Sequence, residues 1–157
     1  MPFDEPFLFA IAGLSASLAG LAGLVAGLRR GDRLLAVDQL RLRQIVEWSF
    51  ANALFALALI PLTSWLGVPA AVRVGGLIAT GLVVLTTLVL LRRIGRVGLP
   101  LDRVTRIVAT TVDLTAFLAG VAAAASGEVI VLQVALLALV ARPMGAFLLV
   151  LSKMENG

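Results

Sequence analysis

Five long apolar stretches decide what this chain can fold into. Each holds at most two charged residues, and they cover residues 7–29, 44–66, 70–92, 105–126 and 129–151. An α-helix needs about 20 mainly apolar residues to cross a hydrocarbon layer of about 30 Å. We therefore predict an all-α fold, a polytopic membrane helix bundle of about five transmembrane helices, organised as a single transmembrane domain over residues 1–157.

The composition supports lipid as the solvent. Of the 157 residues, 61% are hydrophobic and 14% are charged, whereas a soluble domain usually carries about 25% charged residues. The first stretch follows an acidic leader with Asp4 and Glu5, which differs from the positive leader of a signal peptide. We therefore interpret residues 7–29 as a true first span.

The cations predict the orientation of the helices, because short loops rich in Lys and Arg face the cytoplasm. With five spans, two arginine clusters and Lys153 all fall on one side of the membrane. We predict that the N-terminus lies outside and the C-terminus in the cytoplasm. Since topology explains the clusters, we expect no nucleic-acid partner. The clusters are Arg29, Arg30, Arg33, Arg41 and Arg43, and Arg92, Arg93, Arg96, Arg103 and Arg106.

The two arginine loops resemble each other. Residues 28–33 read LRRGDR and residues 91–96 read LRRIGR, and each is followed by a potential helix-capping residue, Asp38 or Asp102. Two hairpins in the same orientation would form a parallel repeat of a kind found in transporters. Alternatively, topology and helix capping alone account for Arg and Asp in both loops.

The side-chain inventory argues against an enzyme. The chain has no His and no Cys, so the commonest metal ligands and catalytic bases are missing. No carboxylate cluster with metal-ligand spacing and no glycine-rich phosphate loop is present. We expect no metal, no cofactor and no catalytic activity, which makes a lipid-modifying enzyme the weakest hypothesis.

Small residues follow one face of the first span. Their spacing of three and four positions predicts a helix-packing face, because small side chains let two membrane helices approach closely. This face packs within one monomer, or it forms an interface between subunits. Its residues are Gly13, Ala16, Gly20, Gly23 and Gly27.

Three ionisable residues lie inside the predicted spans, where a charge costs on the order of 2.5–3.5 kcal/mol on insertion scales. Glu47 lies about 6 Å inside the cytoplasmic boundary, and it either pairs with Arg43 or lies at the mouth of a path. Asp113 and Arg142 lie deeper, about 10 and 16 Å from the same side. We predict that Asp113 and Arg142 form a buried pair. Such a pair either fixes the packing register or belongs to an ion or proton path.

Pro143 is a candidate helix break beside Arg142, because proline removes a backbone donor. Broken helices beside charges form binding sites in some transporters. Asn52 adds a polar group inside the second span. It lies about 140° around the helix from Glu47, so Asn52 and Glu47 do not share one polar face.

Two functional hypotheses remain nearly level. The first is an ion channel or small-solute transporter with Asp113, Arg142, Glu47 and Asn52 near its path. The second is a non-catalytic accessory or scaffold subunit of a membrane complex. Under both, the expected partners are the lipid bilayer and either further copies of the chain or a larger complex. The expected location is the plasma membrane, as a multi-pass protein of a bacterial inner membrane.

Overall fold

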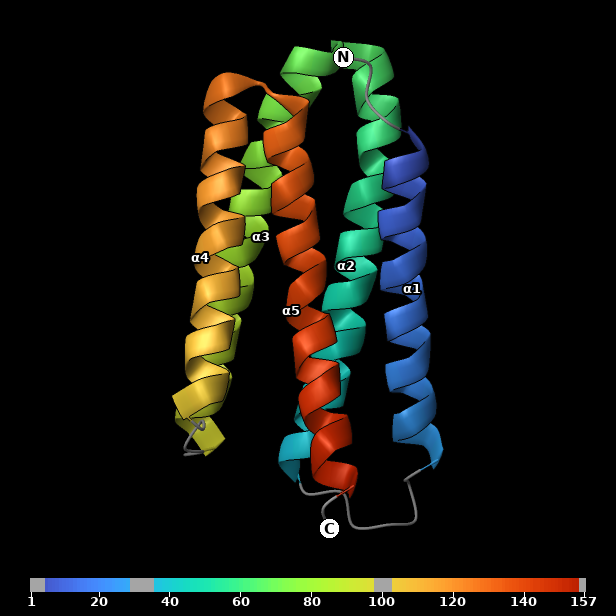
Figure 1. The fold of residues 1–157 in the computed structure, drawn as a ribbon, viewed down its shortest axis with the longest axis vertical. Coiled ribbons are helices and arrows are strands. Elements are labelled where there is room, and N and C mark those ends of the chain that lie inside the picture. The colour runs from blue at the N-terminus through green and yellow to red at the C-terminus, as the bar shows by residue number, and fades with distance from the viewer. Residues whose placement is uncertain (1–4, 29–35, 98–102, 156–157) are drawn as a thin grey trace. The chain divides into compact units, whose positions relative to one another are not determined.

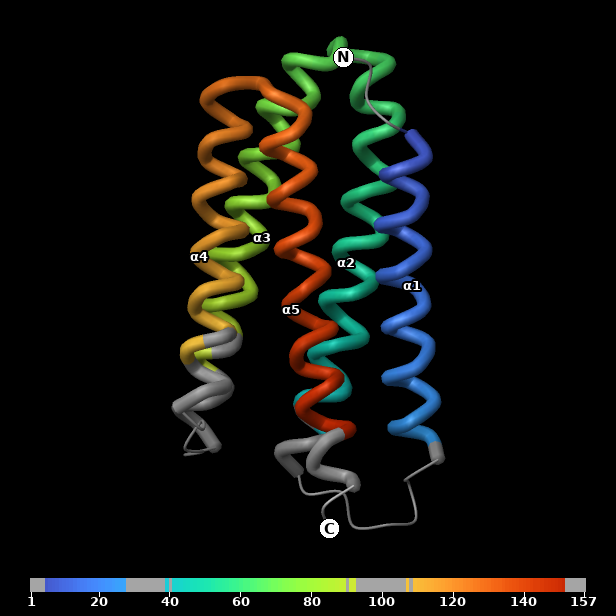
Figure 2. The backbone as a smooth tube through the Cα atoms, viewed as in Figure 1, coloured from blue at the N-terminus to red at the C-terminus, as the bar shows by residue number. Residues whose placement is uncertain are grey.

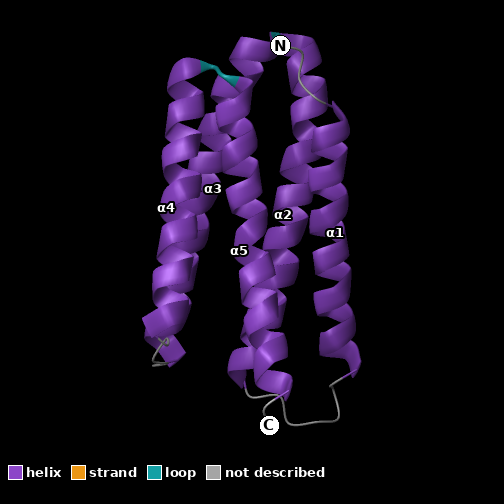
Figure 3. Cartoon of the chain, viewed as in Figure 1, coloured by secondary structure: helices purple, strands orange, loops and turns teal. Residues whose placement is uncertain are grey.

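The chain is helical throughout the part that can be described. The computed structural model describes residues 5–28, 36–97 and 103–155, apart from some side chains next to the gaps. The helices are α1 (Glu5–Leu28), α2 (Ala36–Leu66), α3 (Val68–Val97), α4 (Arg103–Ser126) and α5 (Val129–Glu155), as labelled in Figure 1. Colouring by secondary structure shows only helix and short loops in these residues (Figure 3). The predicted all-α fold with five helices is confirmed.

Each helix is long and apolar enough to cross a membrane. The candidate spans are Glu5–Gly27, Arg41–Leu66, Val68–Val89, Ala109–Ser126 and Val129–Leu151. Large apolar side chains stay exposed along every helix, such as Phe9, Leu54 and Leu85. Soluble proteins rarely expose apolar surface on this scale, so the chain is built as a multi-pass membrane protein. The orientation of its termini stays a prediction.

The helices continue beyond the apolar stretches at their arginine-rich ends. α2 begins at Ala36, ahead of the predicted span at 44–66, and α3 ends at Val97, beyond residue 92. Leu, Gln and Arg are good helix formers, so a helix that leaves the apolar layer does not have to end there. Arg29, Arg30 and Arg33 lie outside the described residues, and with them the first copy of the loop repeat, whereas the second copy, residues 91–96, belongs to α3.

Two glycines join helices in tight turns. Gly67 lies between α2 and α3 with φ 76°, and Gly127 lies between α4 and α5 with φ 73°. Their N–H groups donate to the carbonyl oxygens of Thr63 at 3.0 Å and Ala123 at 2.9 Å. Glycine adopts this left-handed conformation without strain and ends helices for that reason.

The chain forms two compact units, which are described separately. The α3–α4 unit contains Pro61–Leu139, and the α1–α2–α5 unit contains Asp4–Ile60 with Val140–Gly157. α2 and α5 each contribute residues to both units. Whether residues 1–157 form a single domain stays a prediction.

Close backbone contact holds the α3–α4 unit together. The two helices run antiparallel beside each other (Figure 2). A Cβ atom built on Gly76 would lie 2.5 Å from the backbone nitrogen of Ala124 and 2.5 Å from the carbonyl oxygen of Gly120. A Cβ on Gly120 would lie 2.5 Å from Thr80 Oγ1. Glycine at both positions therefore permits the approach that small residues provide in membrane helices.

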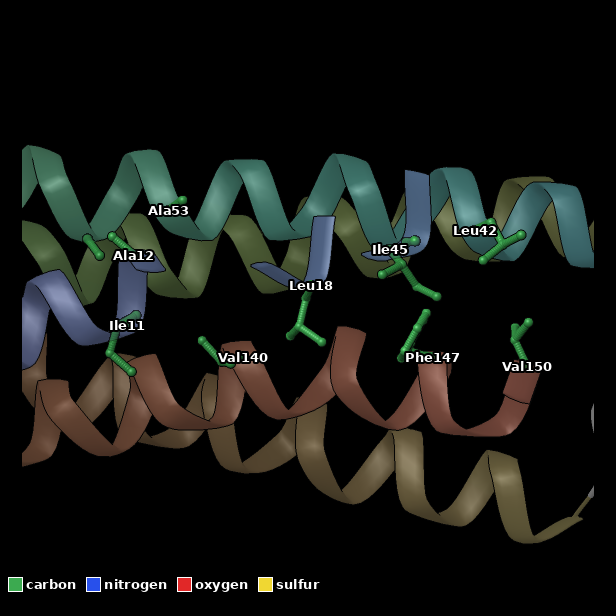
Figure 4. Close-up of a cluster of buried hydrophobic side chains, with 11 residues drawn as sticks. Ile11, Ala12, Leu18, Leu42, Ile45, Ala53, Val140, Phe147 and Val150 are labelled. Carbon is green, nitrogen blue, oxygen red and sulfur yellow. The ribbon is translucent and has the colours of Figure 1, made fainter. Parts of the chain in front are cut away.

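Apolar side chains from three helices form the core of the α1–α2–α5 unit. Figure 4 shows them in a row along the helices, with Ala12, Ala53 and Val140 toward one end and Ile45 and Phe147 toward the other. The full cluster is Ile11, Ala12, Leu18, Ala22, Leu42, Ile45, Ala53, Ala56, Val140, Phe147 and Val150. The matched positions show that α2 runs antiparallel to both α1 and α5.

Candidate functional site: a buried polar cluster

Five polar side chains are buried among the described residues of the α1–α2–α5 unit, and two of them, Ser15 and Ser49, lie on the faces that form its apolar core. Ser15 lies between Ala12 and Leu18 in α1, and Ser49 lies between Ile45 and Ala53 in α2. Arg142 of α5 is also buried, but it lies about 200° around its helix from Val140 and therefore on another face than this core. We call the following set the polar cluster: Ser15 (0% exposed), Gln44 (8%), Ser49 (0%), Asn52 (5%) and Arg142 (9%).

The cluster lies well inside the apolar part of each helix. At 1.5 Å per residue, Arg142 is about 14 Å from the end of its span at Leu151. Ser15 is about 18 Å from Gly27, and Ser49 is about 12 Å from Arg41. Because the chain buries these side chains, their energy depends on the partners that the surrounding residues provide.

Arg142 lies over an aromatic ring. Its guanidinium carbon is 3.8 Å from the centroid of the Trp48 ring. Trp provides the strongest cation–π face of any side chain, and the attraction increases when the pair is removed from water. The contact offsets part of the cost of burying a charge that arginine keeps under all ordinary conditions.

The two serine hydroxyls of the cluster differ from other hydroxyls in the chain. Ser17, Thr80 and Ser126 each donate to the carbonyl oxygen four residues earlier, at 2.8 Å. Thr111 and Thr115 do the same at 2.9 Å. Among the described residues, the buried Oγ atoms of Ser15 and Ser49 have no hydrogen-bond partner, and neither has Nε2 of Gln44. These three groups are therefore buried without a partner, which is costly in an apolar interior.

A regular spacing places two members of the cluster, Gln44 and Asn52, on one face of α2 with Trp48. Gln44, Trp48 and Asn52 are four residues apart and lie on one helix face. Asn52 and Arg142 were predicted from the sequence, whereas Ser15, Gln44, Trp48 and Ser49 were missed because none of them carries a charge. Asn52 aligns with Gln44 and Trp48 along the helix, and not with Glu47.

Asp113 has a hydrogen-bond partner within the α3–α4 unit. Thr87 Oγ1 of α3 donates to Asp113 Oδ2 of α4 at 3.2 Å, and both residues are half-buried. The contact lies on the same interface as Gly76 and Gly120, farther along the hairpin. Asp113 and Arg142 belong to different units, so their predicted pairing stays a prediction.

Glu47 forms an ion pair with Arg43, which is one of the two alternatives predicted from the sequence. Its Oε1 atom is 2.7 Å from Nε of Arg43, one turn earlier in α2. The Arg43 side chain is 75% exposed and that of Glu47 is 39% exposed. Glu47 therefore lies at the exposed margin of the helix and not in the polar cluster.

Pro143 does not end its helix. α5 is continuous from Val129 to Glu155, and Pro143 is fully buried beside Arg142. Among the described residues, no group of three or more His, Cys, Asp and Glu side chains could hold a metal ion.

The glycine face of α1 points away from the core. Gly13, Ala16, Gly20, Gly23 and Gly27 are all exposed. A Cβ atom built on any of the four glycines would meet nothing within 4 Å. This face is therefore not packed within the described part of the chain, and an interface with another chain stays a prediction.

No family model, curated protein sequence or solved structure matches this chain. The geometry of the polar cluster therefore carries the functional argument alone.

Proposed function

We propose that this chain is a small membrane transport protein, an ion channel or small-solute transporter, with the polar cluster on its path. One observation carries the proposal: Ser15, Ser49 and Gln44 are at least nine-tenths buried and hold polar atoms without a hydrogen-bond partner among the described residues. The proposed location is the plasma membrane, as in a bacterial inner membrane.

The cost of such groups favours a transport role over a purely structural one. Leaving a buried polar group unsatisfied costs about 1–3 kcal/mol, and buried polar groups in proteins are normally paired. The part-buried hydroxyl of Thr80 avoids the cost by donating to the Gly76 carbonyl oxygen of its own helix. Side chains that only fixed the packing of α1, α2 and α5 would gain stability by bonding to one another, whereas a transport path needs groups that exchange partners with the molecule passing through.

A flux measurement tests this function. The protein is reconstituted in liposomes, and uptake of a panel of monovalent ions and small polar solutes is measured for the wild type, Ser49→Leu and Ser17→Leu. We expect Ser49→Leu to reduce flux at least tenfold, because leucine fills the buried cluster with apolar volume. Ser17 is exposed on the outer face of α1, so Ser17→Leu should retain wild-type flux. Folded wild-type protein without flux of any tested species would contradict the proposal.

The exposed glycine face of α1 supports a second candidate function, an accessory subunit of a membrane complex. Close helix packing through small residues is a common way for membrane helices to associate, and the four open glycines offer such a surface. Cross-linking in native membranes distinguishes the cases. A link from α1 to a different protein supports the accessory role, whereas a link only to a second copy supports a homo-oligomer.

A further inference from the structure

We infer that one end of the α3–α4 unit lies in the headgroup layer of the membrane, where Trp65 anchors it by binding lipid. This end, called the turn end below, consists of residues 64–73 and 126–129. The proposed transport function does not involve this surface. The inference follows from the exposure of Trp65, from its place at the ends of the spans, and from the polar residues at the same level.

Trp65 is the most exposed large hydrophobic residue in the described part of the chain. It is 84% exposed, against 66% for Leu54 and 56% for Phe9, whereas Arg142 covers the ring of the other tryptophan, Trp48. An indole is an apolar ring with one N–H donor, and at this exposure the donor needs an acceptor from the surroundings. Hydrocarbon offers none, whereas the headgroup layer offers phosphate and ester oxygens, and tryptophan is enriched there for this reason.

The ends of the candidate spans place Trp65 at the boundary of the apolar layer. The spans of α2 and α3 meet at Gly67, and those of α4 and α5 meet at Gly127 and Glu128. A Cβ atom built on Gly127 would lie 3.3 Å from the carbonyl oxygen of Pro69, so the two turns lie side by side at one end of the unit (Figure 1). Four spans therefore end at about the same level, with Trp65 two residues before the α2–α3 turn.

Exposed polar and charged residues lie at the same level. Arg73, Ser126 and Glu128 are exposed, and Nε of Arg73 is 3.3 Å from the position that a Cβ atom on Gly127 would take. The Glu128 N–H donates to Ser126 Oγ at 3.2 Å. Charged groups are costly in hydrocarbon, whereas an exposed indole ring is costly in water. The headgroup layer accommodates both, which is why we assign lipid as the partner of the turn end.

Depth-dependent fluorescence quenching tests the inference. The chain has two tryptophans, so Trp48→Phe leaves Trp65 as the only emitter, and phenylalanine keeps an aromatic ring beside Arg142. The protein is reconstituted in phosphatidylcholine vesicles that contain spin-labelled lipid, with the label either next to the headgroup or near the end of the acyl chain. We expect the shallow label to cause a larger loss of Trp65 emission than the deep label.

A tryptophan in the middle of the same helix provides the matched control. Leu54 is 66% exposed and lies about 16 Å from Trp65 along α2, at 1.5 Å per residue. In a background with Trp48→Phe and Trp65→Phe, the Leu54→Trp variant should show the opposite order, with the larger loss of emission from the deep label. Circular dichroism verifies that both proteins are folded.

Each other result overturns the inference in a recognisable way. Stronger quenching of Trp65 by the deep label would place the turn end in hydrocarbon. Quenching by aqueous acrylamide and by neither lipid label would place it in water. Protection from acrylamide and from both labels would mean that a protein, such as a second copy of the chain, covers Trp65. None of these results depends on flux through the polar cluster, so the inference and the proposed function are tested separately.

Discussion

At the scale of single residues, burial separates the three charges that the sequence analysis grouped together. Arg142 is 9% exposed and lies on Trp48, Asp113 is half-buried and accepts from Thr87, and Glu47 pairs with the exposed Arg43. Only Arg142 belongs to the polar cluster. The others are held by neighbours that explain their positions locally.

The Glu47–Arg43 pair should contribute little to stability or flux. Exposed ion pairs four residues apart in a helix are worth about 0.3–0.5 kcal/mol, so Glu47→Gln should change the free energy of unfolding by no more than that. The measurement is denaturation in mixed micelles, with Gln44→Leu as the comparison inside the cluster. Loss of flux in a folded Glu47→Gln variant would contradict this prediction and would mean that Glu47 lies on the transport path.

At the scale of helices, glycine has opposite surroundings in α1 and α3. Gly76 touches the backbone of α4, whereas Gly20 has open space where a side chain would begin. The sequence pattern is similar at both sites, because a stripe of small residues shows which helix face can approach a partner but not whether the partner is in the same chain. The small residues of α3 pack against α4 of the same chain, whereas no described residue packs against the glycines of α1.

The two glycines should respond oppositely to alanine. Gly76→Ala forces the backbones of α3 and α4 apart and should destabilise the protein by about 1–3 kcal/mol. Gly20→Ala adds a methyl group to open space and removes the helix cost of glycine, so it should be neutral or stabilising by up to about 1 kcal/mol. Thermal unfolding of both variants in the same detergent measures the difference. A Gly20→Ala variant that is monomeric where the wild type is a dimer would reveal a partner on that face.

At the scale of the whole molecule, the apolar stretches predicted the number and type of the helices because lipid admits few other backbone arrangements. The helix ends were less predictable. α2 starts at Ala36, in an arginine-rich segment that is too polar to be predicted as part of a membrane span. The polar cluster was only partly predictable. Arg142 and Asn52 stood out, but Ser15 and Ser49 resemble the surface residues Ser17 and Ser126 in sequence, and only tertiary packing shows that they are buried.

The central claim is that a polar molecule reaches the interior of the α1–α2–α5 unit, and paired cysteine variants on α1 test it most directly. The chain contains no cysteine, so Ser15→Cys and Ser17→Cys each introduce a single thiol at nearly the same depth. Thiols react as thiolates, which form in water and not in lipid. We predict that a small, charged, membrane-impermeant thiol reagent labels Cys at position 15 and not at position 17. Labelling at position 17 alone, or at neither position in folded protein, would contradict the account.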